Sequence, residues 1–332
     1  MTGKFFQTLD RKEQHRIAST TEVLVTMLSD WAQQYRCIQL AHIPSVALLT
    51  STVAPRMLPT EVLPTMKLSF WILGVDNLAD ERQLPLAELR RRMEQWYAAA
   101  LHGTLDRRTM ERPDELTSML LEVRSELARQ ILFKPLYKRW ALEVRRLVEA
   151  MLQEYHFGLE YQTNGSRTLP GMDSYLLYSA ASTGVPLWAL SIWMVTHDMS
   201  LLQQLEPIYL ATQHASAAVR LYNDLIAFEK EPYKNSINAI LISQQQARRN
   251  ALDETLTEAR RAVQRLADLY RQRCRDLIQQ IHTDSRVIEE TLHRTVEFHA
   301  DFYSAHDHRT PVTQPSARAS GRPSQGGIAN QR

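Results

Sequence analysis

The sequence has few of the residues from which disulfide frameworks, zinc sites and nucleotide-binding loops are built. It contains two cysteines, Cys37 and Cys274, and their positions fit neither a zinc-ligand spacing nor a disulfide framework. Its 10 glycines form no glycine-rich phosphate loop and no nucleophile elbow. These absences argue against a zinc enzyme, a P-loop nucleotide-binding protein and a hydrolase with a nucleophile elbow.

Long hydrophobic runs are missing as well. Charged residues occur within the first dozen positions, and no apolar signal-peptide core follows them. The uncharged apolar stretch around residues 45–55 is too short and too broken to cross a bilayer. We therefore expect a cytoplasmic protein in a reducing compartment, without a membrane span.

No large excess of one charge is present either. The formal net charge is +2, but the segment from residue 305 onward carries four arginines and one aspartate, a net +3, so the rest of the chain is near −1. These residues are Arg309, Arg318, Arg322, Arg332 and Asp307. Because nucleic-acid binding needs a broad basic surface, we expect no nucleic-acid partner.

What the sequence does contain is a large supply of helix-forming residues. Leu, Ala, Arg, Gln and Glu dominate its 332 residues, and 44% of the residues are hydrophobic, which is ample for a core. No convincing run of alternating polar and β-branched residues is found, so the fold class expected is all-α. We expect one domain over residues 1–306. From 307 to 332 Pro, Ser, Arg, Gly and Gln dominate, which predicts a disordered tail.

Helical periodicity and breakers divide the domain into segments. We expect an amphipathic helix over 20–37 capped by Thr21, a buried helix over 66–78, and a long helix over 114–133 capped by Asp114. Residues 161–171 read as a loop, and 183–186 read as a break between two helices. Further helices are expected over 201–229, 250–282 and 285–305.

The first acidic motif follows the buried helix. The apolar run that contains Phe70 and Trp71 leads directly to Asp76 and Asp80, which lie four residues apart and hence on one helix face. An acidic helix end is often simply solvated, which we regard as an equally good explanation of this motif taken alone. However, the bulky residues upstream commit the helix to the interior, where carboxylates need a partner to offset desolvation, and a metal ion is a natural one.

The second acidic motif lies 147 positions later, counted from residue 76 to residue 223. Asn223, Ala227 and Glu231 fall on one face of the expected helix, at i, i+4 and i+8. Alone this pattern occurs by chance in many helical proteins. Two helices that present hard oxygen ligands across a cavity can hold magnesium, and magnesium can grip a diphosphate.

The two motifs in this order resemble those of class I terpene synthases, over about residues 20–310. The stretch from Asp76 to Glu81 resembles the family's aspartate-rich motif, with Asn77 in place of the usual second Asp. The stretch from Asn223 to Glu231 resembles the second metal motif, except that Ala227 stands where Ser or Thr is usual. The resemblance implies a helical bundle around a central active-site cavity.

The resemblance also implies roles for individual residues. Asp76, Asp80, Asn223 and Glu231 would be the catalytic metal ligands for three Mg²⁺ ions, and water would take the place of the side chain that Ala227 lacks. Lys230 matches the basic residue that contacts diphosphate, and Arg309 is a second candidate for that role. Asn238 also fits the family pattern. The residues expected to line the cavity are Phe70, Trp71, Tyr175, Gly184 and Tyr222; for any single aromatic residue, core packing is the more common role.

Two departures from the family bear on the substrate. The diphosphate-sensing Arg that many members carry near Ser179 is absent, and Thr310 follows Arg309 where a Tyr is usual. Both resemble features of bacterial, kaurene-synthase-like diterpene synthases, which implies a C20 substrate: geranylgeranyl diphosphate or a bicyclic labdane- or clerodane-type diphosphate such as kolavenyl diphosphate. Water capture or deprotonation of the cation would give an alcohol or an olefin.

Other functions stay open at this point. A sesquiterpene synthase, a prenyltransferase or a squalene/phytoene-type condensing enzyme would share the fold and the magnesium chemistry, although condensing enzymes normally show two Asp-rich motifs of like kind. The Asp-x-Asp-Asp motif of protonation-initiated cyclases is absent. A non-catalytic helical scaffold is the alternative of another class. We expect the protein to be a monomer or a homodimer.

Overall fold

The computed structural model describes residues 4–80, 84–105, 113–165, 169–230, 237–249 and 255–302. These residues form helices and connecting turns and contain no strand, which confirms the expected all-α fold. The helices are α1 (Lys4–Thr8), α2 (Arg11–Ala32), η1 (Leu40–His42), α3 (Ile43–Val53), α4 (Pro59–Asp80), α5 (Leu86–His102), α7 (Glu115–Leu127), α8 (Phe133–Asn164), α9 (Met172–Ser182), α10 (Val185–Val195), η3 (Met199–Gln203), α11 (Leu205–Lys230), α12 (Ala239–Arg249), α13 (Leu256–Ile278) and α14 (Val287–Phe302).

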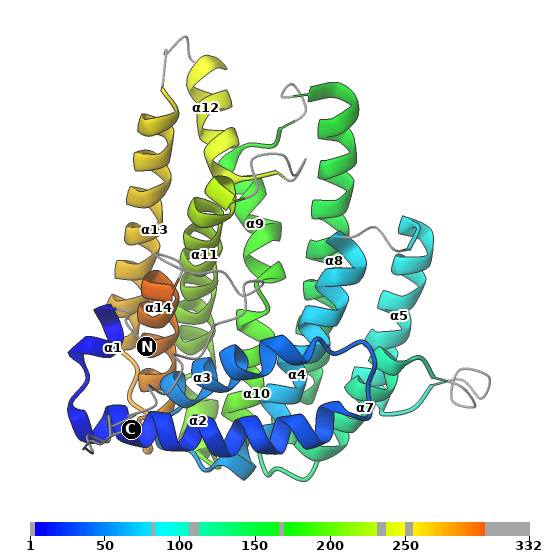
Figure 1. Ribbon diagram of the computed structural model, residues 1–332, viewed down its shortest axis with the longest axis vertical. Coiled ribbons are helices and arrows are strands. Elements are labelled where there is room, and N and C mark those ends of the chain that lie inside the picture. The colour runs from blue at the N-terminus through cyan, green and yellow to red at the C-terminus, as the bar shows by residue number, and fades with distance from the viewer. Residues whose placement is uncertain are drawn as a thin grey trace, which may run out of the picture.

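Helix α10 lies at the centre of the bundle. All 11 of its residues are buried, and it contacts α4, α7, α8 and α11. In Figure 1 the longer helices stand around it, and α2 runs across the lower end. Because burying one large apolar side chain contributes about 1.5–3 kcal/mol, packing rather than capping stabilises this helix, which has no polar face.

The break expected over residues 183–186 is present but shorter, at Thr183 and Gly184. Helix α9 ends at Ser182 and α10 begins at Val185, with Pro186 in its first turn. Between them Gly184 has a φ of 74°, in the left-handed region that glycine adopts at little cost. The chain therefore changes direction between two buried helices without unfolding either.

The helix starts depend on side-chain caps, and one of them was predicted wrongly. Asp114 caps α7 by accepting a hydrogen bond from the Thr117 N–H at 3.0 Å, as expected. The first long helix, however, begins at Arg11 with Asp10 as its cap. The Thr21 hydroxyl lies inside that helix and donates to the Ile17 carbonyl. The helix start was misplaced because Thr bonds equally well to a carbonyl one turn back.

Other boundaries also differ from the expectation. The long helix expected from residue 114 ends at Leu127, and α8 begins at Phe133 and continues to residue 164, into the stretch expected to be a loop. Helix α12 was not predicted, and α13 begins at Leu256 behind the capping box of Thr255 and Glu258. Among the described helices, none is long and apolar enough to cross a membrane.

Candidate functional site

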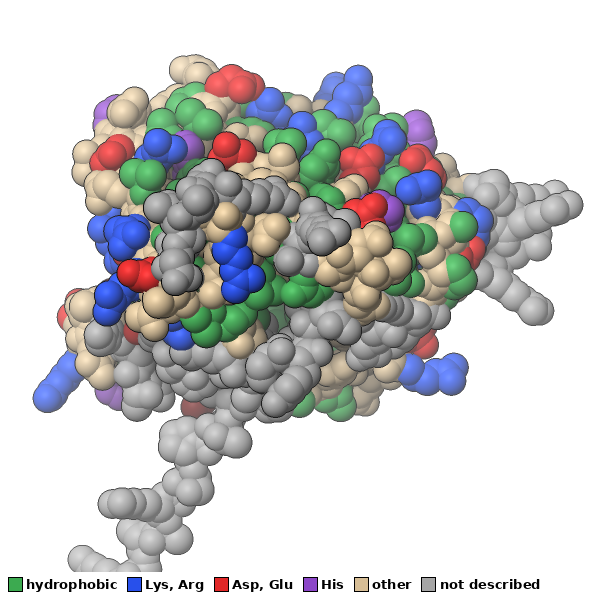
Figure 2. Space-filling model, turned by 90° about the horizontal axis from the view of Figure 1, so that it is seen from above, with side chains coloured by type: hydrophobic (Ala, Val, Ile, Leu, Met, Phe, Trp, Pro, Cys, Tyr) green, Lys and Arg blue, Asp and Glu red, His purple; other side chains and the backbone are tan. Residues whose placement is uncertain are grey.

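The two helices that carry the acidic motifs end at the same end of the bundle. The C-terminal ends of α4 and α11 both point toward the upper end of Figure 1. Figure 2 looks down on this end and shows hydrophobic side chains recessed near the middle of the face. The motifs, far apart in the sequence, thus lie on one end of the molecule.

The break between α9 and α10 connects the two motif helices. On one side, Ile72 of α4 packs against Gly184 so closely that a Cβ there would lie 2.9 Å from the Ile72 Cδ1. On the other side, the Thr183 hydroxyl lies 2.9 Å from the Ser216 hydroxyl of α11. Asp76 is one turn beyond Ile72, about 6 Å along the axis, and Asn223 is two turns beyond Ser216, about 10 Å.

The side chains of Asp76 and Asn223 are both half-buried. A half-buried position is compatible with ligand binding at both residues. Both supply oxygen donors, which are the ligands that Mg²⁺ prefers, so the described part of the predicted metal site fits this ion. Ala227, one turn beyond Asn223, is also half-buried and has no donor to offer.

The remaining predicted ligands cannot be placed. Asp80 and Lys230 are the last residues of α4 and α11, but their side chains are outside the described part of the chain, as are Glu231 and Arg309 altogether. Among the described side chains, no three His, Cys, Asp or Glu residues gather into a group that could hold a metal ion. The complete ligand set therefore stays a prediction.

A buried polar network supports the second motif and was missed by the sequence reasoning. The Tyr175 hydroxyl of α9 donates to Oδ2 of Asp224 at 2.7 Å, and Nε of Arg220 lies 3.1 Å from Oδ1. Arg220 Nη1 also donates to Glu154 of α8 at 2.9 Å and to the Ser182 hydroxyl at 3.2 Å. The available signal was the Arg220–Asp224 pair, an i,i+4 pair of opposite charges in a mainly apolar stretch of α11.

Burial and charge act against each other in this network. Burial raises the pKa of Asp224 above its ordinary value, although the Arg220 guanidinium opposes the effect. Burial alone would lower the pKa of Arg220, but the carboxylates of Asp224 and Glu154 raise it well above the usual range. Burial likewise raises the pKa of Tyr175, so its hydroxyl stays protonated and donates. A permanent cation is thus held between two carboxylates beside the second motif.

The aromatic residues expected to line the cavity are buried, and two of them contact tryptophan rings of the core. The ring of Phe70 lies 6.1 Å from that of Trp31, and the ring of Trp71 meets that of Trp96 edge-on at 5.6 Å. The Tyr222 hydroxyl donates to Asp268 of α13 at 2.8 Å. These contacts fix the orientation of the rings, and the cavity-lining role of the residues stays a prediction.

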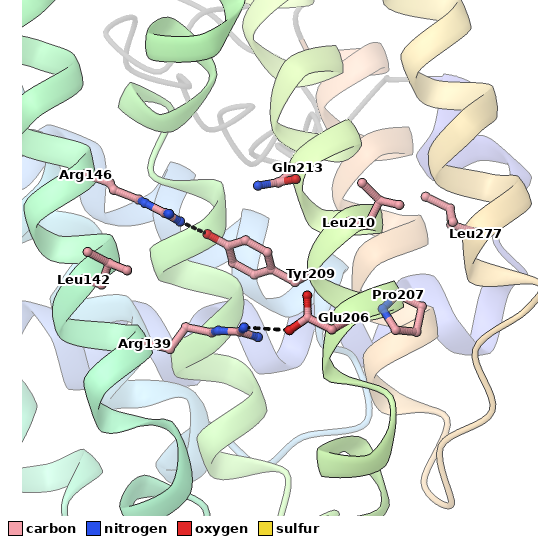
Figure 3. A pocket seen from close by; sticks show the side chains of 9 residues that line it. All are labelled: Arg139, Leu142, Arg146, Glu206, Pro207, Tyr209, Leu210, Gln213 and Leu277. Carbon is pink, nitrogen blue, oxygen red and sulfur yellow. Dashed lines mark hydrogen bonds and ion pairs between the residues drawn. The ribbon is translucent and has the colours of Figure 1, made fainter.

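A separate surface cavity of about 600 Å³ lies between α8, α11 and α13. Arg139 and Arg146 of α8 face Glu206 and Tyr209 of α11 across it (Figure 3). Arg146 donates to the Tyr209 hydroxyl, and Arg139 pairs with Glu206 at 2.9 Å. Asp76 and Asn223, the predicted ligands whose side chains the structure describes, do not line this cavity, so it is distinct from that part of the candidate site.

Comparisons with known proteins agree with this arrangement. The family model described as terpene synthase family 2, C-terminal metal binding, matches residues 67–283, well over half of the chain. That span includes the described members of both motifs, the helix break and the buried network. No match to a curated protein is found.

Several solved structures have the same fold. A protein from ancestral sequence reconstruction, SVS_A2, superimposes with a TM-score of 0.69 at 14% identity, over 91% of this chain and 88% of that one. The structure of 2-methylisoborneol synthase from Streptomyces coelicolor A3(2), solved with Mg²⁺ and 2-fluorogeranyl diphosphate, superimposes with a TM-score of 0.68 at 13% identity, over 87% of this chain and 93% of that one. Abietadiene synthase from Abies grandis superimposes with a TM-score of 0.63 at 12% identity, over 89% of this chain and 38% of that one.

Proposed function

Because this chain belongs to the terpene synthase family, and is therefore an enzyme that acts on prenyl diphosphates, we propose that it ionises a C20 prenyl diphosphate with the help of magnesium. The observation that carries this proposal is the placement of Asp76 and Asn223 on helices that end at one end of the bundle, on either side of the α9–α10 break. A scaffold protein has no need of two oxygen-rich helix ends directed to one place.

In this proposal the metal ligands are Asp76, Asp80, Asn223 and Glu231. The oxygen chemistry of Asp76 and Asn223 supports Mg²⁺, and 2-methylisoborneol synthase, which shares the fold, was solved with Mg²⁺ and a diphosphate. Three bound Mg²⁺ ions would neutralise the charge that develops on the departing diphosphate. A water molecule would stand where Ala227 offers no donor.

Other residues of the chain would bind the diphosphate and shield the carbocation from water. Lys230 and Arg309 would hold the diphosphate oxygens through charge-assisted hydrogen bonds. The aromatic side chains near the break would keep the hydrocarbon dry and attract the carbocation by roughly 0.5–2 kcal/mol per ring. Water capture or deprotonation would end the reaction and release diphosphate with a diterpene alcohol or olefin.

The finer substrate assignment rests on the two departures from the family pattern. The sequence around Ser179 contains no Arg, and Thr310 follows Arg309. These features favour geranylgeranyl diphosphate or a bicyclic labdane- or clerodane-type diphosphate, and kolavenyl diphosphate is the specific hypothesis. The product would then be a tertiary alcohol, as in an enzyme that resembles kolavelool synthase.

Product analysis after incubation with C10, C15, C20 and bicyclic C20 diphosphates tests this proposal. We expect Mg²⁺-dependent product from a C20 diphosphate, while product from the C15 substrate alone would indicate a sesquiterpene synthase. Absence of product from all four, together with no Mg²⁺-dependent thermal stabilisation by inorganic diphosphate, would favour the scaffold.

Two variants test the metal assignment. Asp76→Ala and Asn223→Ala should each abolish turnover while circular dichroism stays helical, because each removes an oxygen ligand from the site. Asp276→Ala, at an exposed position on α13, is the matched control and should keep full activity. Retained turnover in either motif variant would discard the assignment.

A further inference from the structure

The buried network around Arg220 joins three helices at the level of the second motif. The Arg220 guanidinium comes from α11, its partner Glu154 from α8, and Tyr175 and Ser182 from the two ends of α9. The side chain of Arg220 is 16% exposed and that of Asp224 is 2% exposed. The contacts therefore lie inside the protein, where their geometry is fixed by packing.

The residues of the network bracket Asn223. Arg220 lies three positions before it and Asp224 directly after it, so both belong to the same turn of α11. A rotation or a shift of this turn would break the hydrogen bonds to Tyr175 and Glu154 together. Contacts with α8 and α9 therefore hold the direction in which Asn223 points, in addition to the hydrogen bonds within α11.

Asp224 also holds the chain where it returns to the bundle after α11. Its Oδ2 accepts a hydrogen bond from the Ala239 N–H at 3.0 Å, and its backbone carbonyl accepts one from Asn238 Nδ2 at 2.8 Å. The Asn238 Oδ1 in turn accepts from the Ile240 N–H at 2.9 Å. One carboxylate thus connects the turn that carries Asn223 with the first turn of α12.

Stability alone does not explain why ionic groups occupy this position. Removing charged groups from water is costly, and well-packed apolar side chains of similar volume often stabilise a protein as well as a buried ion pair does. A guanidinium instead carries several N–H donors that point in fixed directions within one plane. Hydrogen bonds from these donors to three partners on α8 and α9 are compatible with one rotational orientation of α11.

We propose that Arg220 is a positioning residue for the second metal motif: through Tyr175, Glu154 and Asp224 it sets the orientation in which α11 presents Asn223. This inference rests on the proposed function, because it concerns the same site. It assigns Arg220 no contact with the substrate. Loss of the network should weaken Mg²⁺–diphosphate binding while the bundle stays folded.

The test measures binding of inorganic diphosphate in the presence of Mg²⁺ by isothermal titration, which does not depend on the identity of the hydrocarbon. Tyr175→Phe removes one hydroxyl, and Arg220→Lys keeps the charge but loses the fork. Both should raise the half-saturating Mg²⁺ concentration about 10- to 100-fold, as is typical when the partners of metal ligands are removed. Arg220→Lys should have the larger effect, because it loses more hydrogen bonds.

The matched control is Tyr209→Phe. Tyr209 lies on the same helix, α11, and its hydroxyl also bonds a carboxylate and an arginine of α8, Glu143 and Arg146, but it lies 14 positions before Asn223. We expect this variant to lose thermal stability without a change in Mg²⁺ half-saturation. It therefore measures what a partly buried tyrosine hydroxyl that bonds the same kinds of partner contributes to folding alone.

The possible outcomes separate the two proposals. If the wild-type protein neither binds Mg²⁺–diphosphate nor forms product, the proposed function fails. If the wild-type protein binds and Tyr175→Phe binds with the half-saturation of Tyr209→Phe, the positioning role of Arg220 is overturned while the function stands. If Arg220→Lys does not fold, the half-saturating Mg²⁺ concentration of Tyr175→Phe alone decides whether the positioning role stands.

Discussion

Ile72 of the first motif helix, α4, packs directly against Gly184 in the break between α9 and α10. A Cβ on Gly184 would lie 2.9 Å from the Ile72 Cδ1 and 3.1 Å from its Cγ2, closer than side chains normally approach. Gly184 also has a φ of 74°, which L-residues with a side chain rarely adopt. Two independent constraints therefore act at this glycine, one from its backbone and one from α4.

Gly184→Ala is expected to be destabilising for both reasons. The left-handed conformation costs a non-glycine residue roughly 1–2 kcal/mol, and displacement of Ile72 adds to this, so the free energy of unfolding should fall by about 2–3 kcal/mol. Urea denaturation measures the change. Gly165→Ala is a control for backbone strain without a side-chain contact, because nothing lies within 4 Å of its Cβ position; its φ of 67° and ψ of −158° fall in a region that only glycine readily adopts.

The contribution of the contact follows from a double-mutant cycle. Ile72→Val removes the Cδ1 methyl group and should recover part of the loss in Gly184→Ala, but not in Gly165→Ala. If Ile72→Val recovers none of the loss in Gly184→Ala, only backbone strain matters at residue 184.

Lys67→Met is expected to leave two partly buried carboxylates without their cation. The Lys67 ammonium lies 2.6 Å from Oε1 of Glu122 and 2.6 Å from Oε1 of Glu126, and its side chain is 7% exposed. Removing one member of such a cluster costs about 3 kcal/mol of unfolding free energy. Lys138→Met, at an exposed position on α8, should cost nothing measurable in the same denaturation experiment.

The sign of the pH dependence follows from Glu122. Burial alone would raise its pKa, but hydrogen bonds from Lys67, Tyr35 and Trp31 outweigh burial and lower it. A lowered pKa contributes stability that is present above the pKa of the unfolded state and is lost as the pH falls. In Lys67→Met the pKa of Glu122 should rise, so the deficit should be smaller at pH 4 than at pH 7. A deficit that is the same at both pH values would contradict this explanation.

Apolar patterning predicted the elements that carry the site. The apolar run around Trp71 predicts a buried helix that leads to Asp76, and the sequence from Gly184 to Pro186 predicts a break. The structure has both features. These features are local, because periodicity and breakers act over a few neighbouring residues.

The network around Arg220 could not be predicted in this way. Its partners come from far along the chain: Tyr175 is 49 positions from Asp224, and Glu154 is 66 positions from Arg220. A sequence pattern shows which face a residue occupies, but not which helix packs against that face. For the same reason Trp71 was correctly expected in the interior, while its edge-on contact with Trp96 was not foreseen.

His299 is expected to make the protein sensitive to acid. It is 5% exposed on α14, and its Nδ1 donates to the Thr295 carbonyl at 2.7 Å. Burial lowers its pKa from 6.5 to about 4. Its neutral form thus contributes stability that is complete above pH 6.5 and declines toward pH 4, by up to about 3 kcal/mol in total.

Denaturation of His299→Gln over this pH range measures the contribution. The variant should lose less stability than the wild type as the pH falls from 7 to 4.5. Burial also lowers the pKa of His293 and of His214, so part of the acid sensitivity should remain. His15→Gln, at an exposed position on α2, is the control. A pH profile of His299→Gln parallel to that of the wild type would assign the acid sensitivity to other groups.

Ala227→Ser is expected to improve metal binding, because it adds an oxygen donor one turn beyond Asn223 on α11. An oxygen ligand from the protein is held in place, whereas a water molecule must be ordered each time the metal binds. The half-saturating Mg²⁺ concentration for turnover should therefore fall by about three- to tenfold. Ala98→Ser, at a half-buried position on α5, should leave it unchanged. If Ala227→Ser changes neither the Mg²⁺ dependence nor the rate, the residue does not face the metal site, and the assignment of the second motif has to be revised.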